Sequence, residues 1–234
     1  ADDYLGVLER AMEETGCEGL QEIVLTHGHP DHMGGVASVL ERFGPLPVSK
    51  LPWPGVDEGF GIAELRPLAE GDVVETEGAT LRGLHTPGHA PDHLCFLLEQ
   101  ERALFSGDNV LGVGTTVIPA ETGDLADYMR SLERMLELAP ARIYPAHGPV
   151  IEDGVAKLRE YIAHRHDRER QILDVLQDGP HPVMGIVRRV YAAYPVHLHA
   201  AAAQSVTQHL RKLEREARVA REGWPPLEAV WSRP

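Results

Sequence analysis

The chain has 234 residues, of which 43% are hydrophobic, 25% charged and 6% aromatic. This composition excludes a chain that is disordered as a whole, and no uninterrupted run of about 18 apolar residues is present to span a bilayer. Cys17 and Cys95 are too few and too far apart for a disulfide framework, which favours a reducing compartment and argues against thiol chemistry.

Charge is distributed unevenly along the chain. The formal net charge is −14, yet residues 1–154 carry 9 Lys and Arg against 27 Asp and Glu, whereas residues 155–234 carry 13 against 9. An acidic body followed by a basic tail predicts two modules with different roles, with the boundary after residue 154.

The first module alternates between strand and helix patterns. Helices are expected at residues 2–14 and 34–43, and a strongly amphipathic helix at 124–138 is capped by Asp124. Apolar, β-rich runs predict strands at residues 22–26, 73–76, 80–85, 93–98, 103–106 and 143–145. The alternation predicts an α/β sandwich with mixed sheets.

The second module reads as a series of helices. Helical patterns cover residues 155–177, 183–194 and 198–220, and Gly and Pro mark the breaks between them. A segment from Trp224 to Trp231 follows and could form an extended piece. Three helices followed by an extended segment are typical of a winged-helix domain.

A histidine-rich segment carries the strongest chemical signal. Residues 26–35 read Thr-His-Gly-His-Pro-Asp-His-Met-Gly-Gly directly after a predicted strand. Imidazoles and a carboxylate without a thiolate suit zinc, with manganese or iron as alternatives. A single metal needs only three of these residues, so the four candidates predict part of a two-metal site: His27, His29, Asp31 and His32.

Three further segments end an apolar run with a potential ligand beside a glycine. They read Pro87-Gly88-His89, Ser106-Gly107-Asp108 and Ala146-His147-Gly148. Each places a His or Asp at the end of a predicted strand, where side chains converge on a shared cleft. One such residue would mean little by itself, and the prediction depends on their joint order.

In this order the residues resemble the metallo-β-lactamase-fold superfamily, whose pattern is His-x-His-x-Asp-His followed by His, Asp and His. The resemblance covers roughly residues 20–150 and implies an αββα sandwich, here with a C-terminal winged-helix-like domain. It implies that His27, His29 and His89 bind one metal and that Asp31, His32 and His147 bind the other, with Asp108 bridging them. An Asp at this bridging position disfavours a β-lactamase of the cysteine-containing type.

The resemblance also suggests a mechanism. Two zinc ions about 3.5 to 4 Å apart would share a water, lower its pKa and yield a bridging hydroxide nucleophile. Asp31 could relay a proton as well as bind metal. His93, four residues after His89, could protonate the leaving group; a supporting or surface histidine is the alternative.

A closer resemblance extends over most of the chain, including the tail. It is carried by residues 77–82, 86–89, 114–117, 127–129 and 146–151, by His164-Arg165 and by Gln171-Ile172-Leu173. These residues resemble the β-lactamase-like protein 2 branch, metal-dependent endoribonucleases that act on single-stranded RNA and are found in animal mitochondria. The resemblance implies an RNA partner, no membrane partner and a mitochondrial matrix location, with the cytoplasm as the alternative.

The tail offers a separate hint of RNA binding. Basic residues recur along the last predicted helix and its exit, and they could line one flank for phosphates: Arg211, Lys212, Arg215, Arg218 and Arg221. The alternative is a solvated face that Glu214, Glu216 and Glu222 neutralise. Trp224 and Trp231 could stack on bases or serve as packing residues.

Two other functions stay open. A glyoxalase-II-like thioesterase shares the metal pattern and the Thr-Pro-Gly-His segment, so the metal ligands do not separate it from a nuclease. The third possibility is a catalytically inactive metal-binding scaffold. Family members place a β-hairpin region and an Asp-Thr-Gly segment some fifty residues before the first motif, whereas 26 residues precede His27 here. We therefore expect N-terminal strands to be missing and this chain to be less active than a longer form.

Overall fold

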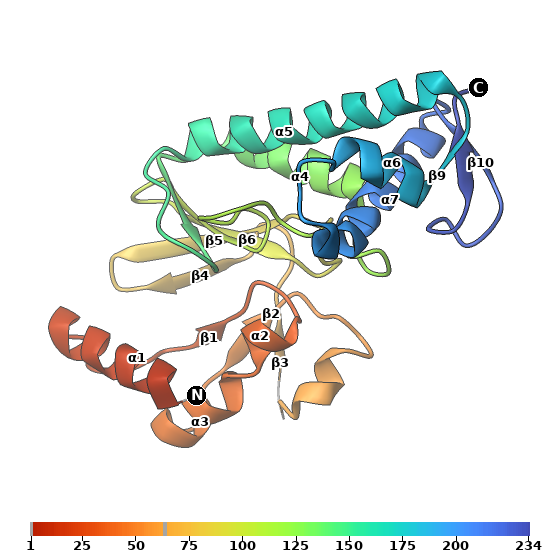
Figure 1. Cartoon of the computed structure of the whole chain (residues 1–234). Coiled ribbons are helices and arrows are strands. Elements are labelled where there is room, and N and C mark those ends of the chain that lie inside the picture. Colours follow the sequence, from red (N-terminus) through yellow and green to blue (C-terminus); the bar gives the residue numbers. More distant parts are fainter. Residues whose placement is uncertain (1, 63–64) are drawn as a thin grey trace.

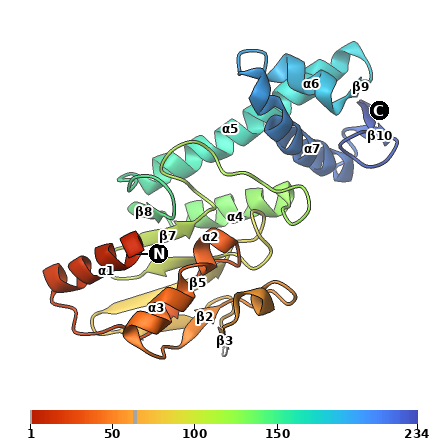
Figure 2. The same ribbon diagram turned by 60° about the horizontal axis from the view of Figure 1, so that its bottom comes forward.

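A computed structural model describes residues 2–62 and 65–234, with side chains from residue 4 onward (Figure 1). Two sheets pack face to face and helices cover their outer sides, with α4 (Leu125–Glu137) and α5 (Gly154–Val175) above and α3 (Val36–Phe43) below in Figure 1. A small helical domain extends from the far end of α5, as Figure 2 shows. The predicted αββα sandwich with a C-terminal winged-helix domain is confirmed.

The N-terminal part holds the smaller sheet. Helix α1 (Asp2–Thr15) precedes β1 (Ile23–Val24), and the sheet continues with β2 (Val48–Lys50) and β3 (Leu65–Pro67), all parallel, in the order β1-β2-β3. The predicted strand at 22–26 is therefore confirmed in a shorter form. Strands β2 and β3 were not predicted, because each has only three residues and prolines interrupt the pattern around them.

Short helices connect the strands of this sheet. The turn α2 (Pro30–Met33) and helix α3 (Val36–Phe43) lie between β1 and β2, and the 3₁₀ turn η1 (Asp57–Phe60) lies between β2 and β3. Met33 and Val36 pack against Leu25 and Val48. This packing fixes α2 over the end of β1, where the histidine motif begins.

The larger sheet contains β4 (Val73–Thr76), β5 (Ala79–His85), β6 (Leu94–Leu98), β7 (Ala103–Gly107) and β8 (Arg142–Pro145). Its order is β4-β5-β6-β7-β8; the first four strands are antiparallel and β8 runs parallel to β7. A parallel neighbour needs a crossover, which α4 (Leu125–Glu137) provides. All these predicted elements are confirmed within a residue or two of their bounds.

Helix α4 shows how the sequence specifies its own placement. The Asp124 side chain accepts hydrogen bonds from the backbone N–H groups of Ala126 and Asp127, at 2.8 and 3.0 Å, so the predicted cap is confirmed. Its apolar stripe contains Leu125, Tyr128, Leu132 and Met135. The stripe packs against Leu104 and Ile143 of the larger sheet and against Leu158 and Tyr161 of the next helix.

The C-terminal domain has three helices and a small sheet. It comprises α5 (Gly154–Val175), the turn η2 (Leu176–Asp178), β9 (His181–Pro182), α6 (Val183–Val190), the turn η3 (Val196–Leu198), α7 (His199–Arg215), β10 (Ala220–Glu222) and β11 (Val230–Ser232). The sheet is antiparallel in the order β10-β11-β9. Trp231 lies fully buried at the centre of this domain's core.

The prediction of one helix over residues 198–220 is wrong at its end. Helix α7 stops at Arg215, Ala217 adopts a left-handed backbone with φ of 56°, and residues 220–222 pair with β11 instead. Pairing with the distant strand β11 outweighs the local helix preference of Glu, Ala and Arg. A short sequence window does not contain that strand and so does not reveal the pairing.

Helix α5 belongs to both halves of the molecule. Its first turns contribute Leu158 and Tyr161 to the core beneath α4, while Ile172 and Leu173 enter the core of the winged-helix domain. The domain boundary after residue 154 stays a prediction, and in the structure it coincides with the start of a helix that both cores share. Among the helices of the described residues, none has the length and apolar character needed to cross a membrane.

Candidate metal centre

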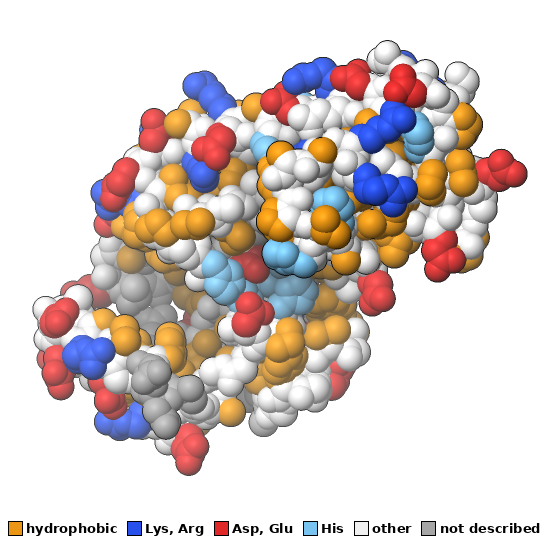
Figure 3. Space-filling view, viewed as in Figure 1, with side chains coloured by type: hydrophobic (Ala, Val, Ile, Leu, Met, Phe, Trp, Pro, Cys, Tyr) orange, Lys and Arg blue, Asp and Glu red, His pale blue; other side chains and the backbone are white. Residues whose placement is uncertain are grey.

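Four separate segments bring the seven predicted ligand residues together. His27 and His29 follow β1, Asp31 and His32 lie in α2, and the other three follow strands of the larger sheet: His89 after β5, Asp108 after β7 and His147 after β8. Figure 3 shows histidine side chains gathered between the part that holds β1–β3 and the part above it. The side chains thus meet beside the strand ends, where the sequence pattern predicts a shared cleft.

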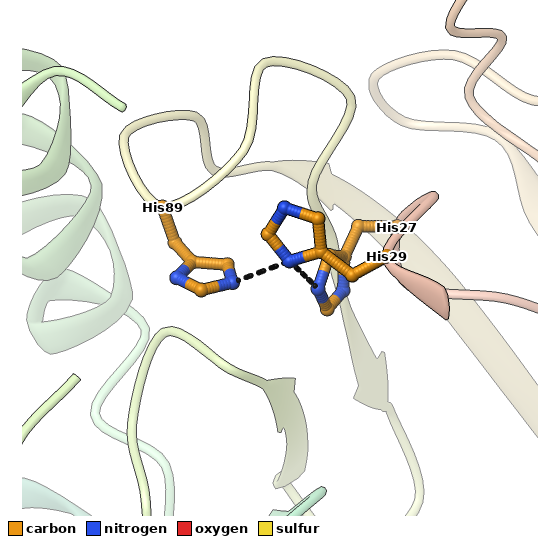
Figure 4. Close-up of side chains that lie close together, drawn as sticks. All are labelled: His27, His29 and His89. Carbon is orange, nitrogen blue, oxygen red and sulfur yellow. Dashed lines mark hydrogen bonds between the residues drawn. The ribbon is translucent and has the colours of Figure 1, made fainter. Parts of the chain in front are cut away.

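Three histidines form one largely buried group. The Nε2 atoms of His27 and His89 each lie 3.0 Å from Nδ1 of His29 (Figure 4). Nδ1 of His89 donates to the carbonyl oxygen of Val117 at 2.8 Å, which leaves Nε2 of the neutral ring as a lone pair directed at the other two rings. These three nitrogens can hold one metal ion.

The protonation of this group favours cation binding. Burial, reinforced by the neighbouring histidines, lowers the pKa of His27 far below its ordinary value. Burial also lowers the pKa of His89. Both rings are therefore neutral at physiological pH and can donate a lone pair to a metal.

The second group contains two carboxylates and two imidazoles. Asp31, His32, Asp108 and His147 place their ligand atoms within 4.8 Å of one another. Nε2 of His147 lies 3.3 Å from Oδ2 of Asp31 and 3.3 Å from Oδ1 of Asp108. Mixed oxygen and nitrogen donors of this kind suit a divalent transition metal.

Asp108 faces both groups. Its Oδ1 lies 3.3 Å from Nε2 of His32, whereas its Oδ2 lies 3.5 Å from Nε2 of His89. Burial raises the pKa of Asp108, but the nearby imidazole of His32, aided by His89 and His147, holds that pKa below its ordinary value. The carboxylate thus stays ionised with one oxygen available to each group.

The two groups differ in their access to solvent. His27 is fully buried and His89 nearly so, whereas the side chains of Asp31 and His147 are 58% and 50% exposed. Asp31 and His147 are therefore the candidate ligands most open to solvent. A largely apolar cavity of about 750 Å³, lined in part by Tyr4, Phe105 and Tyr144, reaches Asp31 from the side of α1.

His93 lies behind Asp108, away from the exposed side. Its ring is fully buried, and its Nε2 accepts a hydrogen bond from the backbone N–H of Asp108 at 3.1 Å. Burial lowers the pKa of His93 well below its ordinary value, so the ring carries no proton on Nε2 to give. This geometry favours a role in positioning Asp108 over the predicted proton transfer to a leaving group.

The glycines beside the ligands have packing reasons. A Cβ on Gly107, where φ is +50°, would lie 2.6 Å from Nε2 of His93 and 3.0 Å from Cβ of Thr26. A Cβ on Gly88, where φ is +130°, would lie 2.4 Å from the Cα of Tyr128 in α4. Each glycine permits a close approach that sets the direction of the next residue, a ligand candidate.

Sequence reasoning missed a buried ion cluster beneath the histidine loop. Lys50 is fully buried, with Nζ 2.7 Å from Oδ1 of Asp57 and 2.8 Å from Oδ2 of Asp92. A Cβ on Gly28 would lie within 3.4 Å of both carboxylates, so the cluster supports the segment between His27 and His29. A lone Lys in a three-residue strand offers no sequence signal.

The aromatic residues of the loop and the tail differ in exposure. Trp53, which could line the cleft mouth or pack on the body, is half-buried with its ring centroid 6.1 Å from that of His29. Trp231 is a core residue, whereas Trp224 is 78% exposed, with the Arg221 guanidinium 5.0 Å from its ring. Of these two tail tryptophans, Trp224 is therefore the one accessible to a ligand.

The basic residues of the tail have partners within the protein. Lys212 contacts Glu169 and Glu216, both at 2.7 Å, and Arg215 contacts Asp124 at 2.7 Å. The others contact an acidic side chain or a carbonyl: Arg218 with Glu169 and Glu216, Arg221 with Glu214, and Arg211 with the carbonyl of Ala120. Of the three acids named in the sequence-based alternative, Glu214 and Glu216 therefore do form ion pairs here, while Asp124 and Glu169 provide the other carboxylates.

Comparison with known proteins gives two family matches. Residues 15–147 match the metallo-β-lactamase superfamily, and residues 183–225 match the β-lactamase-associated winged-helix domain. A β-lactamase-like protein 2 homolog from Caenorhabditis elegans is 39% identical over 215 residues, which cover 90% of this chain and 70% of that protein.

Solved structures agree with this. A metallo-β-lactamase family protein from Thermus thermophilus has a TM-score of 0.74 at 28% identity, and the match covers 98% of this chain and 85% of that protein. A protein crystallised in a di-iron-bound form is 33% identical with a TM-score of 0.50, and the match covers 63% of this chain and 79% of that protein. Fold, family matches and relatives agree that the chain belongs to the metallo-β-lactamase superfamily, in the branch that contains the β-lactamase-like protein 2 homologues.

Proposed function

We propose that this chain is a two-metal hydrolase that cleaves phosphodiester bonds of single-stranded RNA. The observation that carries the two-metal part is Asp108, which turns one carboxylate oxygen to each of two groups of possible ligands. The choice of RNA is supported by the similarity to β-lactamase-like protein 2 homologues and by the winged-helix domain.

The residues present fit a pair of divalent metals. Nε2 of His32 and Oδ1 of Asp108 are buried and face each other at 3.3 Å without full hydrogen-bond geometry, an arrangement that a shared cation would satisfy. His27, His29 and His89 would hold one ion; Asp31, His32 and His147 would hold the other, with Asp108 shared. Nitrogen and oxygen donors without thiolate suit zinc, manganese or iron, and the di-iron form of a similar protein supports a paired site.

Bound metals would supply Lewis acidity and activate water for attack on the ester. The protein supplies the positions: the hydrogen bond from His89 to Val117 orients that ring, and His93 orients Asp108 through its backbone N–H. Asp31 lies on the exposed side of the cluster, 3.3 Å from Nε2 of His147, where its carboxylate can accept a proton from a group entering from solvent.

One comparison tests the proposal. Purified protein is assayed side by side on a single-stranded RNA and on a glutathione thioester, with and without chelator, and Asp108→Asn serves as the control variant. RNA cleavage that chelator and Asp108→Asn both abolish supports the nuclease. Thioester turnover without RNA cleavage would replace it with a glyoxalase-II-like enzyme. Bound metal without either activity would identify a metal-binding scaffold.

A further inference from the structure

A second cavity, of about 170 Å³, lies between the metal-binding domain and the winged-helix domain. The loop of residues 115–118 forms one wall, α5 forms another through Arg165 and Arg168, and Ser205 of α7 lines it as well. At about 30 Å³ per water, this volume holds about five waters or one small polyatomic ion. None of the seven residues of the metal cluster lines it.

Two arginines in the wall are buried without a compensating charge. Arg165 is 5% exposed and Arg168 is 8% exposed, and the Nε of each is buried without a hydrogen-bond partner. Nη2 of Arg165 donates to the carbonyl of Thr116 at 2.6 Å, and Nη1 of Arg168 donates to Oε1 of Gln171 at 2.8 Å. Within the described residues, no carboxylate forms an ion pair with either guanidinium.

A nearby carboxylate could have supplied that charge but is already used. Glu169, one residue after Arg168, pairs with Lys212 and Arg218 instead. Because an arginine cannot lose its proton in a protein, both charges persist in the folded state. A buried charge without a partner is strongly unfavourable, and the two lie beside an open volume that an anion can enter.

The remaining surroundings favour an anion and supply no competing one. The guanidinium of Arg168 lies 4.1 Å from the ring centroid of Tyr191, and that of Arg165 lies 5.1 Å from the centroid of Tyr128. Stacking on these aromatic faces leaves the edges of the guanidinium groups, where their N–H donors lie, free for hydrogen bonding. Thr115 and Ser205, whose side chains carry hydroxyl groups, line the same space.

We propose that this cavity is an oxyanion subsite that binds a phosphate group, either free inorganic phosphate or a phosphate carried by a larger ligand. Two guanidinium groups, each with a buried Nε donor that lacks a partner, and two hydroxyl-bearing residues surround this space, which suits the acceptor oxygens of a tetrahedral phosphate. The subsite does not depend on which ester the metal centre hydrolyses.

The subsite adjoins the supports of the metal cluster. Thr116, whose carbonyl accepts from Arg165, donates through its Oγ1 to the carbonyl of Asp108 at 2.7 Å. The next carbonyl, that of Val117, accepts from Nδ1 of His89. An anion that orders Arg165 therefore also orders the loop that holds one residue from each metal group.

The test measures inorganic phosphate binding to the metal-loaded full chain by isothermal titration calorimetry. Every variant retains the metal centre, so differences in phosphate binding between the variants reflect changes at the cavity. Arg168→Gln should weaken one class of phosphate sites at least tenfold. The matched control is Arg170→Gln, because Arg170 lies on the same helix, is 66% exposed and pairs with Asp167. Its phosphate binding should equal that of the unmodified chain.

A second variant keeps the charges and removes the space. Ser205→Leu fills the cavity with both arginines present, and it too should weaken phosphate binding at least tenfold; it decides the matter if Arg168→Gln fails to fold. Unchanged binding in a folded Ser205→Leu protein would overturn the proposal, as would a chain that binds no phosphate outside the metal centre. A parallel titration with a dinucleoside monophosphate separates the sources: binding lost in the same variants identifies a ligand-borne phosphate, and binding confined to inorganic phosphate identifies the free ion.

Discussion

The backbone N–H of Asp108 donates to Nε2 of His93 across 3.1 Å, so a buried imidazole holds the residue that faces both groups of possible metal ligands. Removing this acceptor leaves a buried N–H without a partner, at a cost of about 1–3 kcal/mol. It also releases the orientation of the carboxylate.

His93→Leu is therefore expected to lower metal affinity by about 10- to 100-fold, the usual effect of losing a residue that orients a ligand. Metal content after dialysis against a weak chelator measures this, with kcat determined at saturating metal. A fall in kcat with unchanged metal affinity would instead assign His93 the proton-transfer role that its spacing from His89 suggests.

Lys50→Met is expected to destabilise the fold by about 3–5 kcal/mol, because it leaves the Asp57 and Asp92 carboxylates without their cation. Urea unfolding measures the loss. Arg130→Gln is the control, since it breaks an exposed pair with Asp127 and should cost less than about 1 kcal/mol. Equal effects from the two variants would show that the buried cluster does not stabilise the histidine loop.

Gly107→Ala and Gly114→Ala separate backbone strain from steric conflict. Both glycines have positive φ, +50° and +77°, but a Cβ on Gly107 would collide with His93, whereas nothing lies within 4 Å of one on Gly114. Gly114→Ala should cost about 1–2 kcal/mol from backbone strain alone and leave metal binding intact. Gly107→Ala should lose more stability and bind metal more weakly, as thermal unfolding and metal titration would reveal. Identical behaviour of the two variants would refute the packing argument for Gly107.

The pH dependence of stability should reveal His209. This ring is almost fully buried, and burial, aided by Arg165 and Lys212, lowers its pKa well below the ordinary value. Its stabilising contribution is complete above the unfolded pKa of about 6.5 and falls with pH below that, because only the unfolded chain takes up the proton. The expected slope is about 1.4 kcal/mol per pH unit for each such histidine.

His209→Gln should reduce the slope of the unfolding free energy against pH by this amount between pH 6.5 and 5. Urea unfolding at constant ionic strength measures the slope. An unaltered slope in His209→Gln would mean that His209 takes up its proton in the folded state as well.

Arg215 tests the RNA contact that the sequence predicts for the basic flank of α7. Its pair with Asp124 is half exposed and so contributes little to stability, which means that a phosphate can take the place of the carboxylate. Arg215→Gln should weaken RNA binding at low salt and reduce the slope of log K against log salt by about 1. Arg170→Gln is the control on α5. RNA binding that is insensitive to Arg215→Gln would exclude this flank.

The metal cluster was predictable because its signal is local. His27 to His32 lie within one six-residue segment, and the other three ligands each follow an apolar run that a sequence window detects. Lys50 was not predictable, since its partner Asp92 lies between β5 and β6 of the larger sheet and meets β2 only in the folded protein. The end of α7 was predicted wrongly for the same reason, because the strand that pairs with residues 220–222 starts at Val230.

Because α5 supplies Leu158 and Tyr161 to one core and Ile172 and Leu173 to the other, this single helix stabilises both domains. Cutting the chain after residue 154 would expose the face of α4 that packs against α5. Weaker RNA binding by such a truncated chain would therefore reflect misfolding and not the loss of RNA contacts. The two halves should melt in one transition, and evolutionary exchange of the C-terminal domain would have to carry this entire helix with it.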